Sequence, residues 1–377
     1  MTSISTLLPT YATINLAALA HNLSRIKRYL SPGCEVMAIV KANAYGHGAI
    51  ETAQSLARQG IGQFAVASLD EGIALRQAGL SASIVVLGAL FEEQVSELIT
   101  HRLTPVVSDG RILPTLAKAA HSHHAPYSIH LKVETGMGRL GFSPEELLTA
   151  LDNSLLHSPL KVEGLMTHLA DADGSDSAYT ERQLVAFQAL LEQMRQRGFT
   201  IPVVHAANSA AIVRFPGAHF SLVRPGIMLY GYHTLPATIQ DPDLRPVLSL
   251  HTTVAQLRTI PKGCSVSYNG TFVAKRQTRI AVLPIGYADG YSRRISHRGS
   301  VLIQGRRAPI VGLVCMDMIM VDVTDIAPLE VGETVTLIGQ QGKESIWADE
   351  VADWIGTIPY EVLCGIGSRV PRIYESA

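Results

Sequence analysis

The stretch MAIVKANAYGHG, residues 37–48, is a short apolar run that ends at a lysine. Ala38, Ile39 and Val40 predict a buried strand, because continuous apolar and β-branched residues are typical of strands covered on both faces. Lys41 ends this strand, and small residues, a tyrosine and two glycines come next. A lysine in this position is either a solvated strand end or an amine held at the end of the strand for chemistry.

Similar apolar runs follow along the chain. Stretches with helical periodicity separate them, such as SLDEGIALRQAG and AYTERQLVAFQALLEQMRQRG. The eight predicted strands are residues 36–40, 64–67, 84–87, 104–107, 128–133, 162–167, 203–206 and 221–223. Eight strands that alternate with helices favour an α/β fold with an N-terminal (β/α)8 TIM-like barrel, and an open doubly wound parallel sheet is the alternative.

A second domain is predicted after the Pro- and Asp-rich linker TLPATIQDPDLRP, residues 234–246. Beyond this linker, short strands alternate with Gly, Pro and Asp turns, as in TRIAVLPIGYADGY and ETVTLIGQQG, which is typical of a mainly β domain. We therefore expect a barrel over residues 1–245 and a β-rich C-terminal domain over residues 246–377. The first ~15 residues could join the β domain instead.

Composition narrows the class of protein. The 377 residues carry a formal net charge of −1, and a near-neutral chain without long basic runs does not suit nucleic acid or an anionic membrane as its main partner. No apolar run reaches the ~18 residues of a membrane span, and the N-terminus lacks the basic region and long apolar core of a secretory signal. The four cysteines have no metal-binding spacing, so we expect a reduced cytoplasmic protein without a metal.

Chemically useful residues recur at the predicted strand ends. Lys41 ends the first strand, Lys132 lies near the end of the fifth, and His168 ends the sixth. The residues of this kind near the seventh and eighth strands are His205, Asn208, Ser209, Arg224, Gly226 and Ile227. Active sites of this barrel lie at the C-terminal ends of its strands, so we expect one shared rim. A lysine amine there can form a Schiff base with pyridoxal 5′-phosphate, and hydroxyl and backbone N–H groups can bind the phosphate.

Nine segments resemble those of bacterial alanine racemases, and they occur in the order found in that family. They are MAIVKANAYGHG, HLKVETGMGRLGF, GLMTHLADAD, HAANSAA, VRPGIMLYG, VSYNGTF, PIGYADGY, VCMDM and IPYEVL. The segments lie between residues 37 and 363, so the resemblance covers both expected domains. It implies a pyridoxal-phosphate enzyme that interconverts L- and D-alanine for peptidoglycan. It also implies a homodimer with active sites shared between subunits.

The resemblance also implies roles for individual residues. Lys41 would hold the cofactor and act as one catalytic base, and Tyr268 of the partner subunit would be the opposite base. The implied contacts of the phosphate are Tyr45, Ser209, Gly226, Ile227 and Tyr360. The residues implied near the pyridine ring are Arg224, His168, His205 and Asn208. The residues implied near the substrate are Arg139 and, from the partner subunit, Met316. Tyr287, Arg293 and Asp317 resemble residues of the family's access corridor and partner-side pocket.

Arg224 suits racemisation better than the other reactions of this cofactor. Most such enzymes place a carboxylate against the pyridine nitrogen, which keeps it protonated and makes the ring a strong electron sink. A guanidinium stays charged and has no acceptor, so it favours an unprotonated nitrogen and disfavours transamination. Both bases need a lowered pKa, and a cationic His168 near Tyr268 would favour its phenolate.

Two positions modify this expectation. Family members often carry a carbamylated lysine where Lys132 stands, whose negative charge orients Arg139, and the alternative is an ordinary strand-end lysine. The family also commonly has an arginine two residues before the cysteine of VCMDM, where this chain has Leu313. We expect this difference to affect substrate range and dimer affinity rather than the type of reaction.

Other interpretations are possible for some features. GMGRLG, residues 136–141, mimics a dinucleotide fingerprint, but it follows four earlier strand–helix units, whereas such a motif usually opens its domain. HSHHAP could bind a metal but is typical of a solvated loop. The competing functions are a racemase of other small amino acids such as serine, a pyridoxal-phosphate decarboxylase of basic amino acids, and a non-catalytic carrier of the cofactor.

Overall fold

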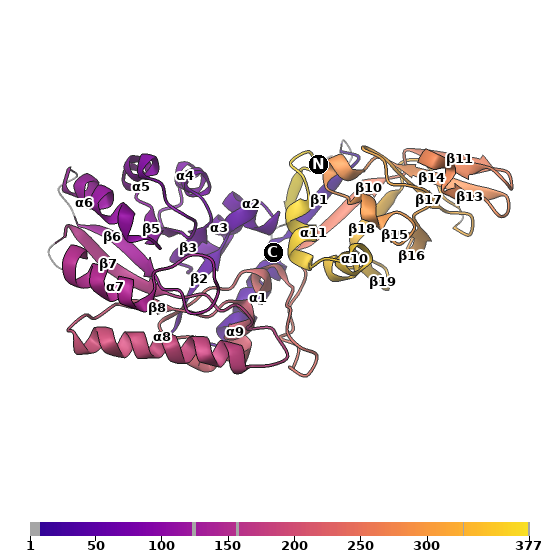
Figure 1. The fold of residues 1–377 in the computed structure, drawn as a ribbon. Helices are drawn as coiled ribbons and strands as arrows, with labels where there is room; N and C mark the ends of the chain where they lie inside the picture. The colour runs from indigo at the N-terminus through magenta and orange to yellow at the C-terminus, as the bar shows by residue number, and fades with distance from the viewer. Residues whose placement is uncertain (1–7, 123–125, 156–157, 327, 376–377) are drawn as a thin grey trace. The chain divides into compact units, whose positions relative to one another are not determined.

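The computed structural model describes residues 8–122, 126–155, 158–326 and 328–375. The chain forms two compact units (Figure 1). Residues 20–44 and 49–244 make up one, which we call the barrel unit. Residues 8–19, 45–48 and 245–375 make up the other, which we call the β unit.

Eight parallel strands form the sheet of the barrel unit, in the order β8-β7-β6-β5-β4-β3-β2-β9. Their bounds are β2 Glu35–Ile39, β3 Gln63–Val66, β4 Ser83–Val86, β5 Thr104–Val107, β6 Tyr127–Lys132, β7 Leu160–Met166, β8 Val203–His205 and β9 Leu222–Val223. Hydrogen bonds from Ser221 N to Val204 O (3.2 Å) and from Arg224 N to Ala207 O (3.0 Å) join the segments of β8 and β9. This closure confirms the expected barrel and excludes the open sheet. The predicted strand bounds differ from these by at most two residues.

Helices alternate with the strands of the barrel unit (Figure 1). They are α3 Ala49–Arg58, α4 Leu69–Gln77, α5 Val95–Thr100, α6 Leu113–Ser122, α7 Pro144–Ala150, α8 Ala178–Gln196 and α9 Ser209–Arg214, and α1 Leu16–Lys27 precedes them. In α8, the buried residues Thr180, Leu184, Phe187, Leu190 and Met194 recur every three or four positions. That spacing puts them on one helix face, which explains why the sequence here reads as an amphipathic helix.

The β unit contains three sheets. The largest has the order β16-β15-β18-β10-β1-β20, with β19 beside β18, and the others are β11-β14-β17 and β12-β13. Strand β1, Tyr11–Asn15, pairs antiparallel with β10 and parallel with β20, so the start of the chain is built into this sheet. The other bounds are β10 Leu248–Thr253, β11 Gln256–Ile260, β12 Ser265–Val266, β13 Phe272–Val273, β14 Thr278–Leu283, β15 Ser300–Ile303, β16 Arg306–Pro309, β17 Ile319–Asp322, β18 Thr334–Gln341, β19 Glu344–Ile346 and β20 Arg372–Glu375. Two helices, α10 Ala348–Ile355 and α11 Pro359–Gly365, complete the unit.

Membrane-spanning helices and clusters of metal-binding side chains are both absent from the described residues. No described helix is both long enough and apolar enough to cross a membrane. Among the same residues, no group of three or more His, Cys, Asp or Glu side chains could hold a metal ion. Of the HSHHAP tract, His121 lies in the last turn of α6, while His123 and His124 lie outside the described residues.

Candidate active site

The barrel brings the candidate residues of its strands to one rim. Lys132 and His205 are the last residues of β6 and β8, and Lys41, His168 and Arg224 follow the ends of β2, β7 and β9 within two residues. Parallel strands of a barrel end on the same face, so these five side chains come from a single rim. The rim is rich in positive charge, since it carries two lysines, Arg224 and, in the loop after β6, Arg139.

The backbone turns left-handed directly after Lys41. Ala42, Asn43, Ala44 and Tyr45 all have φ between 52° and 54°. For residues other than glycine this conformation costs roughly 1–2 kcal/mol each, so surrounding contacts must hold it. Asn43 Oδ1 accepts a hydrogen bond from Ala49 N (2.9 Å), and Ala44 N donates to Val40 O (2.9 Å). Lys41 itself is half-buried at the start of this turn.

Arg224 is the centre of a buried hydrogen-bond network. Its guanidinium, with the residue only 4% exposed, donates from Nη1 to His205 Nδ1 (3.1 Å) and from Nη2 to His168 Nδ1 (3.2 Å). Nη2 also donates to the carbonyl oxygens of Thr167 and Ala206, each at 2.9 Å. Burial lowers the pKa of Arg224 to about 9. The guanidinium is therefore held from several sides at the rim.

The network fixes the tautomers of two histidines. A guanidinium can only donate, so Nδ1 of both His168 and His205 must be unprotonated. Burial and the charge of Arg224 lower the pKa of His168 and of His205 well below the usual value. The expectation of a cationic His168 is therefore wrong, because a buried imidazole beside Arg224 stays neutral at pH 7.

His130 extends this network, and the sequence did not single it out. His205 Nε2 lies 3.0 Å from His130 Nδ1, and both rings are buried. Because His205 Nδ1 is an acceptor, its proton sits on Nε2 and is donated to His130. Gly164 on the adjacent strand β7 makes room for this ring, since a Cβ at that position would lie 2.5 Å from His130. A larger residue at position 164 would clash with the His130 ring, so glycine is required here.

Acid is expected to destabilise the fold through these imidazoles. Burial lowers the pKa of His130 to about 4, whereas in the unfolded chain it titrates near 6.5. The unfolded chain therefore binds more protons in this window, and the free energy of unfolding falls as the pH drops from 6.5 toward 4. One pKa unit is worth about 1.4 kcal/mol. Urea unfolding should give a lower free energy of unfolding at pH 5 than at pH 7, and His130→Gln should reduce this difference. An equal difference between the two pH values in both proteins would contradict the prediction.

Lys132 lies 4% exposed among the other cations of the rim. Burial, with Arg139 and Arg224 adding to it, lowers the pKa of its amine to about 8.

In the loop after β6, the Glu134 carboxylate accepts hydrogen bonds from the backbone N–H groups of Gly136, Met137 and Arg139. The backbone of GMGRLG therefore binds a carboxylate of its own chain, while the Arg139 side chain stays exposed.

Donor groups gather after β8 and β9. Asn208 caps helix α9, with its side chain accepting from Ala211 N (3.0 Å). Ser209, the first residue of this helix, accepts at Oγ from Gly226 N (2.9 Å) and from Met228 N (3.4 Å). The hydroxyl of Ser209 and the backbone that contains Gly226 and Ile227 are thus side by side, and Ile227 begins a short 3₁₀ turn. Loops after the last two strands are where this barrel commonly binds phosphate.

Tyr45 and Tyr360 lie together in the β unit. Their ring centroids are 5.9 Å apart, and burial followed by the neighbouring Tyr360 raises the pKa of Tyr45, so its hydroxyl stays protonated. Arg372 Nε donates to Gly46 O (3.0 Å). A Cβ at Gly46 would lie 2.2 Å from Leu363 O, in α11, so only glycine fits. The second half of the opening stretch is therefore built into the β unit.

Tyr268 and Met316 line one open pocket of the β unit, of about 600 Å³. Tyr268 is 63% exposed and Met316 53% exposed in the single chain. Ser267, with φ 67°, turns the backbone ahead of Tyr268, and its Oγ donates to Leu313 O (2.6 Å). Leu313 therefore supports the Tyr268 turn through its backbone.

The remaining candidates surround Met316. Tyr287 N donates to Cys315 O (3.1 Å), and Arg293 Nη1 donates to Val314 O (2.9 Å). Asp317 pairs with Arg369 (2.9 Å), whose Nε also lies 3.4 Å from Asp289. Tyr287, Arg293, Leu313 and Asp317 thus belong to one cluster with the backbone of residues 313–317.

Models of two protein families match the chain. The model of the alanine racemase N-terminal domain matches residues 14–234, and that of the alanine racemase C-terminal domain matches residues 247–374. The chain belongs to the alanine racemase family. The resemblance seen in the sequence is thereby confirmed.

Individual alanine racemases are similar to this chain over nearly its full length. The alanine racemase of Halothermothrix orenii is 43% identical over 368 residues, which cover 98% of this chain and 97% of that protein. The structure of alanine racemase from Streptomyces coelicolor A3(2) has a TM-score of 0.93 at 35% identity and covers 99% of this chain and 100% of that one. A structure from Bartonella henselae, described with covalently bound pyridoxal phosphate, has a TM-score of 0.88 at 31% identity, with coverages of 98% and 100%.

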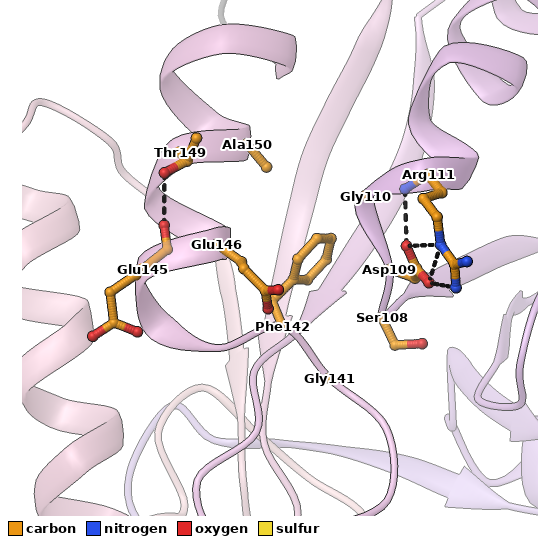
Figure 2. Close-up of a pocket in the computed structure, with 10 residues that line it drawn as sticks. All are labelled: Ser108, Asp109, Gly110, Arg111, Gly141, Phe142, Glu145, Glu146, Thr149 and Ala150. Atoms are coloured by element: carbon orange, nitrogen blue, oxygen red, sulfur yellow. Dashed lines mark hydrogen bonds and ion pairs between the residues drawn. The ribbon is translucent and has the colours of Figure 1, made fainter.

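One cavity of this alanine racemase family member is lined by none of the candidate residues. Figure 2 shows its lining, which comes from the segment after β5, from Gly141 and Phe142, and from helix α7, and its volume is about 830 Å³. Asp109 and Arg111 neutralise each other there, with Arg111 Nε 2.9 Å from Asp109 Oδ2. Glu146 at its edge accepts from Ser143 N (2.8 Å) in the cap of α7. The charged groups of Asp109 and Arg111 are thus engaged with each other, and only Gly141 and Phe142 of this lining belong to a segment that resembles the family.

Proposed function

We propose that this chain is a pyridoxal-phosphate-dependent racemase that interconverts L- and D-alanine and supplies D-alanine for peptidoglycan. The observation that carries the proposal is the rim of the barrel, where Lys41 lies on the same face as Arg224 and its two neutral histidines. Arg224 could only donate to the ring nitrogen of the cofactor, whereas most sites for this cofactor place a carboxylate there.

The residues of the rim fit the cofactor. Its phosphate and the substrate carboxylate are anions, and Arg139 and Arg224 supply positive charge, of which each lowers the pKa of His168. Gly226 N donates to Ser209 Oγ (2.9 Å), so a hydroxyl and a backbone N–H, the kinds of group that bind phosphate, lie side by side. The residues that would hold the cofactor are Lys41, Tyr45, Arg139, His168, Asn208, Ser209, Arg224, Gly226, Ile227 and Tyr360.

The cofactor supplies an electron-withdrawing ring that acidifies the Cα hydrogen of the bound amino acid. The chain's own residues do the rest. The Lys41 amine and the Tyr268 hydroxyl of the partner subunit would remove and return the Cα proton from opposite faces. Arg224 would donate to the pyridine nitrogen and, being held by His205 and His168, keep it unprotonated. Arg139 and the backbone of Met316 of the partner subunit would orient the substrate carboxylate.

A homodimer completes this site. Tyr268, Met316 and Met318 are each at least half exposed in the single chain, which is unusual for large apolar side chains grouped around one pocket. A second copy of the barrel rim would cover them and receive Tyr268. This cytoplasmic dimer would have two equivalent sites, each built from both chains.

Lys132 suits carbamylation by carbon dioxide. Carbamate formation needs the neutral amine, and burial lowers its pKa to about 8, so a substantial fraction is neutral at physiological pH. The carbamate would exchange a positive charge for a negative one beside Arg139 and Arg224. Electron density at the Lys132 amine in a crystal structure would test this, and a bare amine at saturating bicarbonate would exclude it.

The function is tested by circular dichroism of L-alanine, L-serine and L-lysine with the protein and pyridoxal 5′-phosphate. Loss of the L-alanine signal without release of carbon dioxide is expected. Faster loss of the L-serine signal would favour a racemase of other small amino acids. Carbon dioxide release from L-lysine would favour the decarboxylase, and an unchanged signal for all three would favour a carrier.

Arg224→Glu is expected to add transamination to the reaction. A carboxylate at this position would keep the pyridine nitrogen protonated, and the stronger electron sink that the cofactor would then supply favours transamination beside racemisation. Pyruvate formed per alanine racemised should rise by at least about tenfold, in line with a shift of roughly 1.4 kcal/mol between two barriers. Arg214→Glu, on helix α9 but outside the network, is the control, and an unchanged pyruvate ratio in Arg224→Glu would contradict the role of Arg224.

A further inference from the structure

Glu71 occupies a cap position whose usual contact is absent. Helix α4 begins after Ser68, whose side chain accepts from Glu71 N (3.4 Å). In a capping box, the acidic side chain at this third helical position returns to the backbone N–H of the cap residue. Glu71 Oε2 instead accepts from Ala67 N (2.8 Å), and its Oε1 accepts from Ala42 N (2.6 Å). One carboxylate therefore ties together the ends of the neighbouring strands β2 and β3.

The bond to Ala42 lies where the backbone most needs support. Ala42 is the first of the four consecutive left-handed residues, and it directly follows Lys41. At roughly 1–2 kcal/mol each, these residues would relax if their contacts were lost. Asn43 fixes the middle of the turn through Ala49 N (2.9 Å), whereas Glu71 fixes its first peptide N–H.

We propose that Glu71 is a positioning residue for Lys41, because its carboxylate bridges Ala67 N and Ala42 N and so sets the backbone from which the lysine projects. This inference rests on the proposed function only for the role of Lys41. The two hydrogen bonds that the Glu71 carboxylate accepts from Ala67 N and Ala42 N, which we call the clamp, are a property of the barrel. A direction change at Ala42 would move the lysine amine relative to its target, and displacements of about 1 Å at a reacting group can cost on the order of 100-fold in rate.

The two contacts explain why a carboxylate is needed. Both partners are N–H donors, so both side-chain oxygens must accept. Glutamine has the same size but would present an NH₂ group to one of the two donors. Aspartate keeps both acceptors but is one carbon shorter and cannot span both strand ends. Glu71→Gln therefore removes one contact with little change in packing.

The chain offers a matched control. Glu146 is the third residue of helix α7, and its Oε2 makes the ordinary capping-box contact with Ser143 N (2.8 Å). Figure 2 shows the Glu146 side chain. Glu146→Gln weakens a helix cap of the same barrel without touching the turn after Lys41. A general loss of stability would affect both variants, whereas a loss of positioning would affect Glu71→Gln alone.

Hydrogen exchange and kinetics test the proposal together. In protein without cofactor, exchange at the amides of residues 42–45 should rise at least about tenfold in Glu71→Gln and stay unchanged in Glu146→Gln. With cofactor, kcat for alanine racemisation should fall about 10- to 100-fold in Glu71→Gln, with KM changed less than about twofold. Unchanged exchange, or faster exchange with normal kcat, would overturn the proposal.

The two measurements also separate this proposal from the proposed function. If the unaltered protein does not racemise alanine, the proposed function fails, but exchange at residues 42–45 still reports on the clamp. If the protein racemises alanine and Glu71→Gln behaves like Glu146→Gln in both measurements, the proposed function stands and the role of Glu71 is refuted.

Discussion

Lys41→Ala is expected to lower the rate of alanine racemisation by at least about a thousandfold. The lysine would serve both as a base and as the covalent anchor of the cofactor, and one positioned base alone is worth roughly 10²–10⁴-fold. Its place two residues after β2, at the start of a left-handed turn, supports the proposal that the amine is held there for chemistry. Circular dichroism of L-alanine with excess cofactor measures the rate.

Two further variants separate the amine from its charge and from general effects. Lys41→Arg keeps the positive charge but cannot anchor an aldehyde, so it should be nearly as inactive as Lys41→Ala. Lys161→Ala removes an exposed lysine of strand β7 and should leave the rate within about twofold, as most surface substitutions do. A Lys41→Arg protein with substantial activity would mean that only charge is required there.

The barrel could be predicted because each of its strands has a signal in the local sequence. Strands covered on both faces need continuous apolar residues, and that requirement marks β2 to β9 in the sequence to within two residues. The same local logic placed Lys41, Lys132 and His205 at strand ends. The resemblance to the family then implied roles that no spacing could give, such as the proposed partnership of Lys41 with Tyr268 of the partner subunit.

The left-handed turn after Lys41 could not be predicted. Alanine and tyrosine rarely adopt positive φ, and local propensity favours other conformations for KANAY. The turn exists because distant groups hold it, among them a carboxylate 29 positions away in sequence, from Glu71 to Ala42. Local pattern assigned Glu71 only to an amphipathic helix.

His130 and Gln183 were missed for a related reason. His130 sits inside a strand, where one polar residue reads as an interruption, and its function appears only when β8 brings His205 within 3.0 Å. Gln183 lies on the buried face of α8, where it donates to His168 O (3.1 Å) and accepts from Ala170 N (2.9 Å). A buried polar residue on an otherwise apolar stripe was the available signal, because such groups are retained only when they are hydrogen-bonded.

Tyr268→Phe is expected to lower racemisation about 10²–10⁴-fold while leaving the cofactor bound, because phenylalanine keeps the ring and removes one of two bases. The remaining base, Lys41, acts on one face only. Exchange of the Cα hydrogen with deuterated solvent should therefore continue in one enantiomer of alanine and nearly stop in the other. Mass spectrometry of each enantiomer measures this, and equal loss of exchange in both would contradict the two-base arrangement.

Mixing two inactive proteins tests whether the bases come from different chains. If Lys41 and Tyr268 of the partner subunit share a site, a dimer of one Lys41→Ala chain and one Tyr268→Phe chain has one site with both changes and one site with neither. Random reassortment of an equal mixture makes half the dimers mixed, so about one quarter of the normal activity should return. If both bases belonged to the same chain, every site would carry one change and no activity would return. Recovery depends on the exposed Tyr268 reaching a second copy, so its absence, with mixed dimers present, would overturn the shared site.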